Sequence, residues 1–122
     1  MPSITENSLL MAKYDVRIAP SALADISDIA DFYFELVDEE SSQRFIDDVF
    51  DTITSLDSFP ESNAYFDEEH GLRRVRVRNH KISVVYIVDN GVYEVIAFGA
   101  FHVAGKPSEY TQSLVKRLKE LD

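Results

Sequence analysis

The 122-residue sequence contains no cysteine and no tryptophan, and it has only four glycines and four prolines. Without cysteine the chain cannot form a disulfide, a thiolate nucleophile or a thiolate zinc site. No apolar run approaches the roughly 20 residues that span a bilayer. The N-terminus also lacks the basic and apolar blocks of a secretory signal. These absences predict a cytoplasmic protein with no membrane segment.

Basic residues are also scarce, since 12 Lys and Arg stand against 22 Asp and Glu, for a net charge of -10. This imbalance is uneven along the chain. Residues 1–69 hold 17 acidic and 3 basic side chains, whereas residues 70–122 hold 5 acidic and 9 basic ones. The asymmetry indicates an anionic partner for the C-terminal half. The alternative is that acidic helices only keep a small protein in solution.

A chain of this length forms one domain, expected over residues 13–122 behind a flexible tail of residues 1–12. Alternating polar and apolar residues predict a strand at 13–18, and helical periodicity predicts antiparallel helices at 21–37 and 40–58. Period-two patterns predict strands at 72–78, 81–88 and 92–103, after a polar loop at 61–71. Asp89-Asn90-Gly91 is typical of a two-residue hairpin turn. A short helix follows from Pro107.

This order of elements predicts an α+β domain with the helical hairpin packed on one face of an antiparallel sheet. The long apolar strand at 92–103 is expected near the centre of that sheet. The opposite sheet face is short of helices to cover it. We therefore expect the functional site there.

The strongest candidate for chemistry is the arginine-rich segment 73–78. Alternation along a strand places Arg74, Arg76 and Arg78 on one face, about 6.5 to 7 Å apart, with two valines turned into the core. This spacing suits the phosphates of a nucleic-acid backbone. The alternative is a solvated edge strand protected by basic residues. Arg73 is expected on the other side, paired with the acidic helices or with water.

A second group of candidates begins where the strand 92–103 ends. His102 closes that strand, and Lys106 and Tyr110 follow within one loop and the start of a helix. Histidine titrates near neutrality, and tyrosine and lysine assist proton transfer or hold phosphate, so with the arginines they can form an RNA-cleaving site. Alternatively, Tyr110 only packs and His102 is a hydrogen-bonded residue at a strand end. His70 and His80 lack a second ligand at a fixed spacing, so no metal or cofactor is expected.

In their order and spacing, these segments resemble the RelE/ParE superfamily of toxins from bacterial type II toxin–antitoxin modules. The similar segments are Tyr-Asp-Val-Arg-Ile-Ala-Pro-Ser-Ala at 14–22, Ser-Leu-Asp-Ser-Phe-Pro at 55–60, Gly-Leu-Arg-Arg-Val-Arg-Val at 71–77, Ile-Ser-Val-Val-Tyr-Ile-Val at 82–88 and Val-Ile-Ala-Phe at 95–98. The resemblance covers about residues 13–121. It implies the toxin fold and a cognate antitoxin as partner.

The resemblance also implies alternative targets. RelE-like members cleave mRNA at the ribosome, and this ribosome-dependent endonuclease is the first hypothesis. For that reaction the implied catalytic residues are Arg76, His102 and Tyr110, and the implied phosphate-binding residues are Arg74, Arg78 and Lys106. RelE-like enzymes carry an arginine where this chain has Ser83, and its long helical hairpin is similar to the ParE branch. The alternatives are therefore a ParE-type inhibitor of DNA gyrase without catalytic activity, or an inactive relative that only binds its antitoxin.

Overall fold

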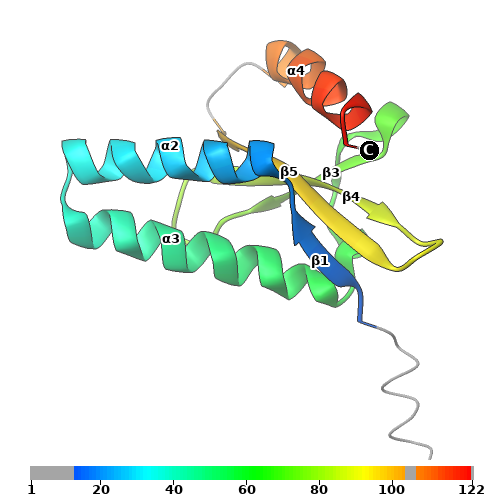
Figure 1. Cartoon of the computed structure of the whole chain (residues 1–122), viewed down its shortest axis with the longest axis horizontal. Coiled ribbons are helices and arrows are strands. Elements are labelled where there is room, and N and C mark those ends of the chain that lie inside the picture. Colours follow the sequence, from blue (N-terminus) through cyan, green and yellow to red (C-terminus); the bar gives the residue numbers. More distant parts are fainter. Residues whose placement is uncertain (1–12, 104–106, 122) are drawn as a thin grey trace, which may run out of the picture.

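Two long antiparallel helices follow the first strand in the computed structural model, which describes residues 13–103 and 107–121 (Figure 1). Helix α2 (Pro20–Leu36) begins at a proline, whose missing amide hydrogen costs nothing in a first turn. Helix α3 (Glu39–Thr54) is capped by Asp38, which accepts a hydrogen bond from the Ser41 amide at 2.7 Å. The predicted hairpin is confirmed. The second helix is shorter than predicted, because a 3₁₀ turn, η1 (Ser55–Asp57), replaces its last turn.

The sheet has five strands in the order β1-β5-β4-β3-β2. Its members are β1 (Asp15–Ile18), β2 (Tyr65–Asp67), β3 (Leu72–Arg76), β4 (Ile82–Asp89) and β5 (Glu94–His102). The predicted meander of the last three strands is confirmed, and β5 lies centrally between β1 and β4. The expectation of a purely antiparallel sheet is wrong, because β1 pairs parallel to β5.

Two predicted connections differ from the structure. The segment 61–71 is not only a loop, since it contains β2, which pairs with β3, and two 3₁₀ turns, η2 (Pro60–Ser62) and η3 (Glu68–His70). The turn after β4 has four residues instead of two, because the flanking pair is Asp89 with Glu94. The Gly91 amide donates to the Asp89 carboxylate at 2.9 Å, and the left-handed residue is Tyr93, with φ 52°.

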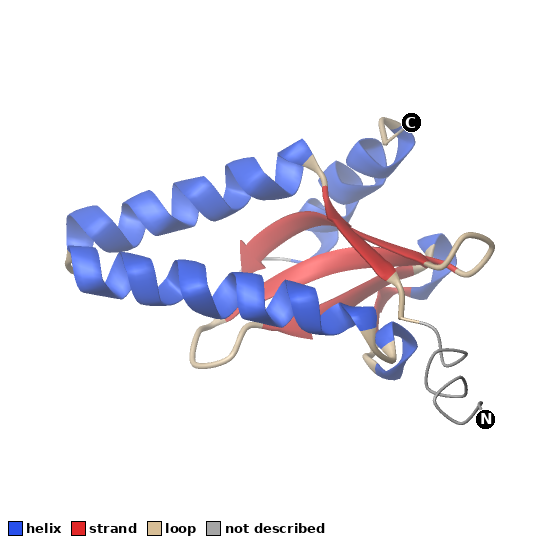
Figure 2. Ribbon diagram, turned by 60° about the horizontal axis from the view of Figure 1, so that its bottom comes forward, coloured by secondary structure: helices blue, strands red, loops and turns tan. Residues whose placement is uncertain are grey.

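The core lies on both faces of the sheet. On one face α2 and α3 cover a cluster that includes Phe45 and Tyr86, both with no exposed surface. On the other face helix α4 (Pro107–Lys119) contributes Leu114 to a second cluster around Phe98 and Phe101. Figure 2 shows the helical hairpin and α4 on opposite sides of the sheet. The second face is therefore less open than expected, since α4 covers its β5 side.

The predicted tail at residues 1–12 lies outside the described residues. Within the described ranges, no helix combines the length and the apolar composition needed to cross a bilayer.

Candidate functional site

The part of the second sheet face that α4 leaves open carries two arginines of β3. Leu72 belongs to the core cluster on the α4 side, whereas Val75 and Val77 pack on the hairpin side. Because side chains alternate along a strand, Arg74 and Arg76 project from the same face as Leu72. The predicted placement of Arg74 and Arg76 on one face of the strand is confirmed.

These two arginines line a hollow of about 360 Å³. Ser83 of β4, the register partner of Arg76, forms part of its wall. The other described residues that line it are Asn63, Ala64, Val75 and Val103. We call this cavity the arginine hollow.

The polar groups of the arginine hollow have few partners within the protein. Arg74 is exposed and makes no ion pair or side-chain hydrogen bond with the described residues. Arg76 donates from Nε to the His80 carbonyl at 2.8 Å, which leaves its terminal nitrogens unpaired among those residues. Ser83 is only 2% exposed, and its hydroxyl likewise has no partner in the described part of the chain. The hollow therefore presents two cations and a buried hydroxyl to an anionic ligand.

The other two arginines of the segment do not line this hollow. Strand β3 ends at Arg76, and the Val77 amide then donates to the Ile82 carbonyl at 2.8 Å as the chain turns, so Arg78 lies in the turn. Arg73 contacts backbone instead of the acidic helices. Its Nη1 donates to the Glu61 and Asn63 carbonyls at 3.1 and 2.7 Å, and its guanidinium lies 4.0 Å from the Tyr65 ring centroid.

His102 lies on the opposite face of the sheet from Arg74 and Arg76. It pairs with Ile82, which belongs to the core cluster under the helical hairpin. It also lines a separate cavity of about 350 Å³ against α2, together with Asp28, Ile29, Phe32, Tyr33 and Ile82. The structure thus separates His102 from the arginines with which the sequence grouped it.

A bulge in β5 causes this separation. Ala97 pairs with Tyr86, but the next pair is Gly99 with Val85, so β5 contains one extra residue at Phe98. An extra residue reverses the alternation of every side chain that follows. Without this bulge, His102 would project from the same face as the arginines.

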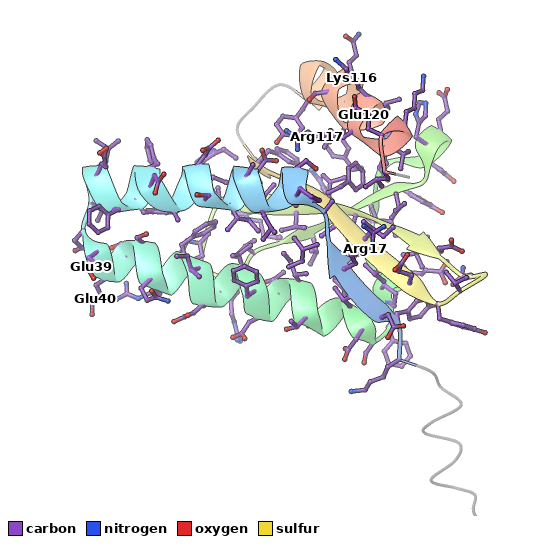
Figure 3. The ribbon with its side chains drawn as sticks, in the orientation of Figure 1. Arg17, Glu39, Glu40, Lys116, Arg117 and Glu120 are labelled. Atoms are coloured by element: carbon purple, nitrogen blue, oxygen red, sulfur yellow. The ribbon has the colours of Figure 1, made fainter. Side chains whose placement is uncertain are left out.

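Tyr110, at the start of α4, is held in a polar cluster with Asp25 and Arg117. Its hydroxyl donates to the Ala100 carbonyl at 2.8 Å and lies 3.4 Å from Asp25 Oδ2. Arg117 binds both carboxylate oxygens of Asp25, at 2.7 and 3.2 Å, and Figure 3 shows it on the inner side of α4. Burial, reinforced by the charge of Asp25, raises the pKa of Tyr110 to about 12. Tyr110 therefore holds its proton at neutral pH.

We predict that the free energy of unfolding falls less steeply at high pH in Tyr110→Phe than in the wild type. The pKa of Tyr110 is raised from 10.0 to about 12, so the folded state keeps a proton that the unfolded chain releases. This stabilisation is complete below pH 10 and is lost as the pH rises towards 12. Between about pH 9 and 11, the free energy of unfolding in urea should fall about 1 kcal/mol more for the wild type than for Tyr110→Phe, a value reduced for partial exposure. Equal losses would contradict the assignment.

Lys106, the remaining candidate, lies outside the described residues. Among the residues that are described, no group of three or more His, Cys, Asp or Glu is placed to hold a metal ion. Asn63 and Asp25 were not among the residues predicted for the site. Asn63 reaches the hollow only through the position of the three-residue strand β2, and Asp25 is one of several similar acidic residues in α2. Neither had a distinguishing sequence signal.

The sequence and the fold of the chain are both similar to those of known proteins. Residues 16–100 match the family model described as the ParE toxin of the type II toxin–antitoxin system parDE. A search of the curated proteins gives no significant match. Among solved structures, a chain of the chromosomal ParDE toxin–antitoxin system from P. aeruginosa aligns with TM-score 0.66 and 18% identity, over 75% of this chain and 97% of that one. A chain of the RelBE2 toxin–antitoxin complex from Mycobacterium tuberculosis aligns with TM-score 0.51 and 16% identity, over 78% and 97%.

The two structural likenesses, at these low identities, show that the fold is shared. They confirm the predicted α+β toxin fold with its N-terminal strand, helical hairpin and C-terminal helix. The family model, in contrast, matches most of the sequence itself. The chain therefore belongs to the ParE toxin family of type II toxin–antitoxin systems, within the RelE/ParE superfamily.

Proposed function

We propose that this toxin acts by binding its target, without cleaving RNA, and that the target is DNA gyrase. The observation that carries this proposal is that neither candidate acid–base group, His102 or Tyr110, is among the described residues that line the arginine hollow. His102 is on the opposite sheet face, and the Tyr110 hydroxyl is engaged with the Ala100 carbonyl.

RNA cleavage requires a proton acceptor and a proton donor within hydrogen-bond reach of the reacting ribose and phosphate. The described residues that line the hollow supply no carboxylate, imidazole or phenol. Ser83 stands where RelE-like enzymes carry a further arginine. Guanidiniums alone bind phosphate but do not transfer protons at neutral pH. The arginine hollow is therefore better suited to holding an anion than to catalysis.

The family match supports the same conclusion, because the ParE branch inhibits gyrase and needs no catalytic residues. In this proposal the open sheet face, with Arg74 and Arg76, contacts an anionic surface of the gyrase–DNA assembly. The cognate antitoxin neutralises the toxin by covering that face. Two of the structures with this fold come from toxin–antitoxin systems, which supports an antitoxin as the partner.

The test is expression of the chain without antitoxin, combined with assays on purified gyrase. We expect growth arrest, loss of plasmid supercoiling by gyrase and accumulation of cleaved DNA, with cellular mRNA intact by primer extension. Relaxation of the same plasmid by a type I topoisomerase is the control and should not change. Discrete cuts inside translated codons would overturn the proposal in favour of the ribosome-dependent endonuclease. Absence of growth arrest would instead identify an inactive, antitoxin-binding relative.

A further inference from the structure

The end of α2 furthest from β1 exposes an unusual amount of apolar surface. Nine large hydrophobic residues of the described chain are exposed, and four of them lie between residues 32 and 37. Phe32 is 59% exposed and Leu36 is 67% exposed. Apolar residues grouped in this way on a small protein mark an interaction surface more often than single exposed ones do.

Two of these exposed residues, Phe32 and Leu36, belong to a stripe with helical spacing that also includes the partly buried Ile29 and Tyr33. Ile29, Phe32, Tyr33 and Leu36 follow one another at the i, i+3, i+4 and i+7 positions of α2, so they share one side of the helix. We call these four residues the α2 stripe. Ile29, Phe32 and Tyr33 also line the 350 Å³ cavity between α2 and the end of β5, and Asp28, Ile82 and His102 complete its described lining. The stripe thus contains a recess that can take an apolar side chain.

Carboxylates run beside the α2 stripe. Asp28, Asp31 and Glu35 are exposed, and none of them forms an ion pair or a side-chain hydrogen bond with the described residues. The segment 20–54 as a whole has ten acidic residues and one basic residue, Arg44. Figure 3 shows two of these acidic residues, Glu39 and Glu40, at the tip of the hairpin. The apolar stripe is therefore flanked by three carboxylates that have no cationic partner among the described residues.

We infer that the α2 stripe is the docking site of a basic amphipathic helix of the antitoxin, with one aliphatic side chain in the cavity and lysines or arginines against Asp28 and Glu35. This inference rests on the proposed antitoxin partner and adds its chemistry. A helix with apolar residues at matching spacing fits the stripe as helix-in-groove complexes do. Charge complementarity excludes an acidic segment there, and it disfavours a second copy of this chain, whose own hairpin would bring like charges together.

The arginine hollow lies on the other face of the sheet and carries the opposite charge. An antitoxin that contacts both surfaces would need an acidic segment for the hollow and a basic one for the α2 stripe. The antitoxin is therefore expected not only to bind but to carry a defined sign of charge at each of these two contacts.

The first experiment measures binding of the purified chain to its full-length antitoxin for the wild type, Phe32→Ala and Phe34→Ala. Phe34 is a matched control, since it is 54% exposed on the same helix but two positions further along, about 160° away from Phe32 around the helix axis. We expect Phe32→Ala to raise the Kd at least about 30-fold and Phe34→Ala to raise it less than about 3-fold. Equal effects of the two substitutions would overturn the inference and leave the proposed function intact.

The second experiment tests the charge. A helical peptide of about 18 residues built from Leu, Ala and Lys is titrated into the chain, alongside one in which Glu replaces Lys. We expect only the Lys peptide to bind, with an affinity that falls as salt rises and on Asp28→Lys. Binding of the Glu peptide alone would overturn the inference, as would a Phe32-dependent dimer of the free chain in light scattering. Failure of the wild type to bind its antitoxin would refute the proposed partner as well.

Discussion

Asp25→Ala is expected to lower the free energy of unfolding by about 3 kcal/mol, because Asp25 joins three elements at one point. Its carboxylate accepts from Arg117 of α4 at 2.7 Å and from the Ala100 amide of β5 at 3.0 Å. Removal leaves the guanidinium without its carboxylate partner, and it leaves the amide of Ala100, a residue only 3% exposed, without its acceptor. Urea unfolding at neutral pH measures the loss.

Two variants separate this cluster from general effects of removing an acid. Asp31→Ala removes an exposed carboxylate of the same helix and should change stability by less than about 0.5 kcal/mol. Asp25→Asn keeps an acceptor for the Ala100 amide but loses the charge. Its loss of unfolding free energy should therefore lie between those of Asp25→Ala and Asp31→Ala. Trypsin should also cut α4 faster in Asp25→Ala, after Lys116 and Lys119. Equal losses of unfolding free energy in Asp25→Ala and Asp31→Ala would show that the cluster of Asp25, Tyr110 and Arg117 does not hold α4 against the sheet.

The close approach of α4 to the sheet explains why Asp25 matters at this position. A Cβ at Gly99 would lie 2.7 Å from Leu114 Cδ2 and 3.2 Å from Arg117 Nη1. Any larger residue at this position would force the Leu114 and Arg117 side chains to shift. With glycine there, Arg117 can reach Asp25 and also donate to the Phe98 carbonyl at 3.2 Å. The hydrogen bond with Asp25 raises the pKa of Arg117, as expected for a cation held by its partner.

The local parts of the fold could be predicted from the sequence. The hairpin follows from apolar spacing of 3.6 residues bounded by Pro20 and Pro60, and the strands of the meander follow from period-two patterns. These signals depend on near neighbours in the chain. The parallel pairing of β1 with β5 and the short strand β2 were not predicted, because both depend on contacts between segments far apart in the sequence.

The candidate site residues show the same contrast between positions that local patterns predict and positions that they do not. Alternation correctly placed Arg74 and Arg76 together, since both lie within one regular strand. Arg78 was misplaced by a strand boundary two residues too long, which is an ordinary error at strand ends. The position of His102 depended on a single extra residue in β5. No local pattern in a nearly all-apolar strand indicates where such a bulge lies.

The double substitution Arg74→Glu/Arg76→Glu is expected to abolish growth arrest and to raise the concentration of toxin that half-inhibits gyrase at least about 100-fold. Arg74 and the terminal nitrogens of Arg76 have no partner among the described residues, so each guanidinium can make charge-assisted hydrogen bonds. Such bonds contribute about 1.5–3 kcal/mol apiece, and two of them correspond to a factor of about 10² or more in affinity. The change also replaces two positive charges by two negative ones, so an anionic surface is repelled. Purified gyrase and a supercoiled-plasmid assay provide the measurement.

Arg44→Glu is the matched control for this double substitution. Arg44 is also an exposed arginine, but it lies on α3 and its recorded ion pair is with Glu40 of the same helix, at 3.7 Å. Reversal of its charge should leave growth arrest and gyrase inhibition unchanged. The double variant should still fold, because Arg74 has no side-chain partner among the described residues and Arg76 has one, the His80 carbonyl. A melting temperature close to that of the wild type would therefore assign the loss of toxicity to binding. A double variant that arrests growth as the wild type does would exclude the arginine hollow from contact with the target.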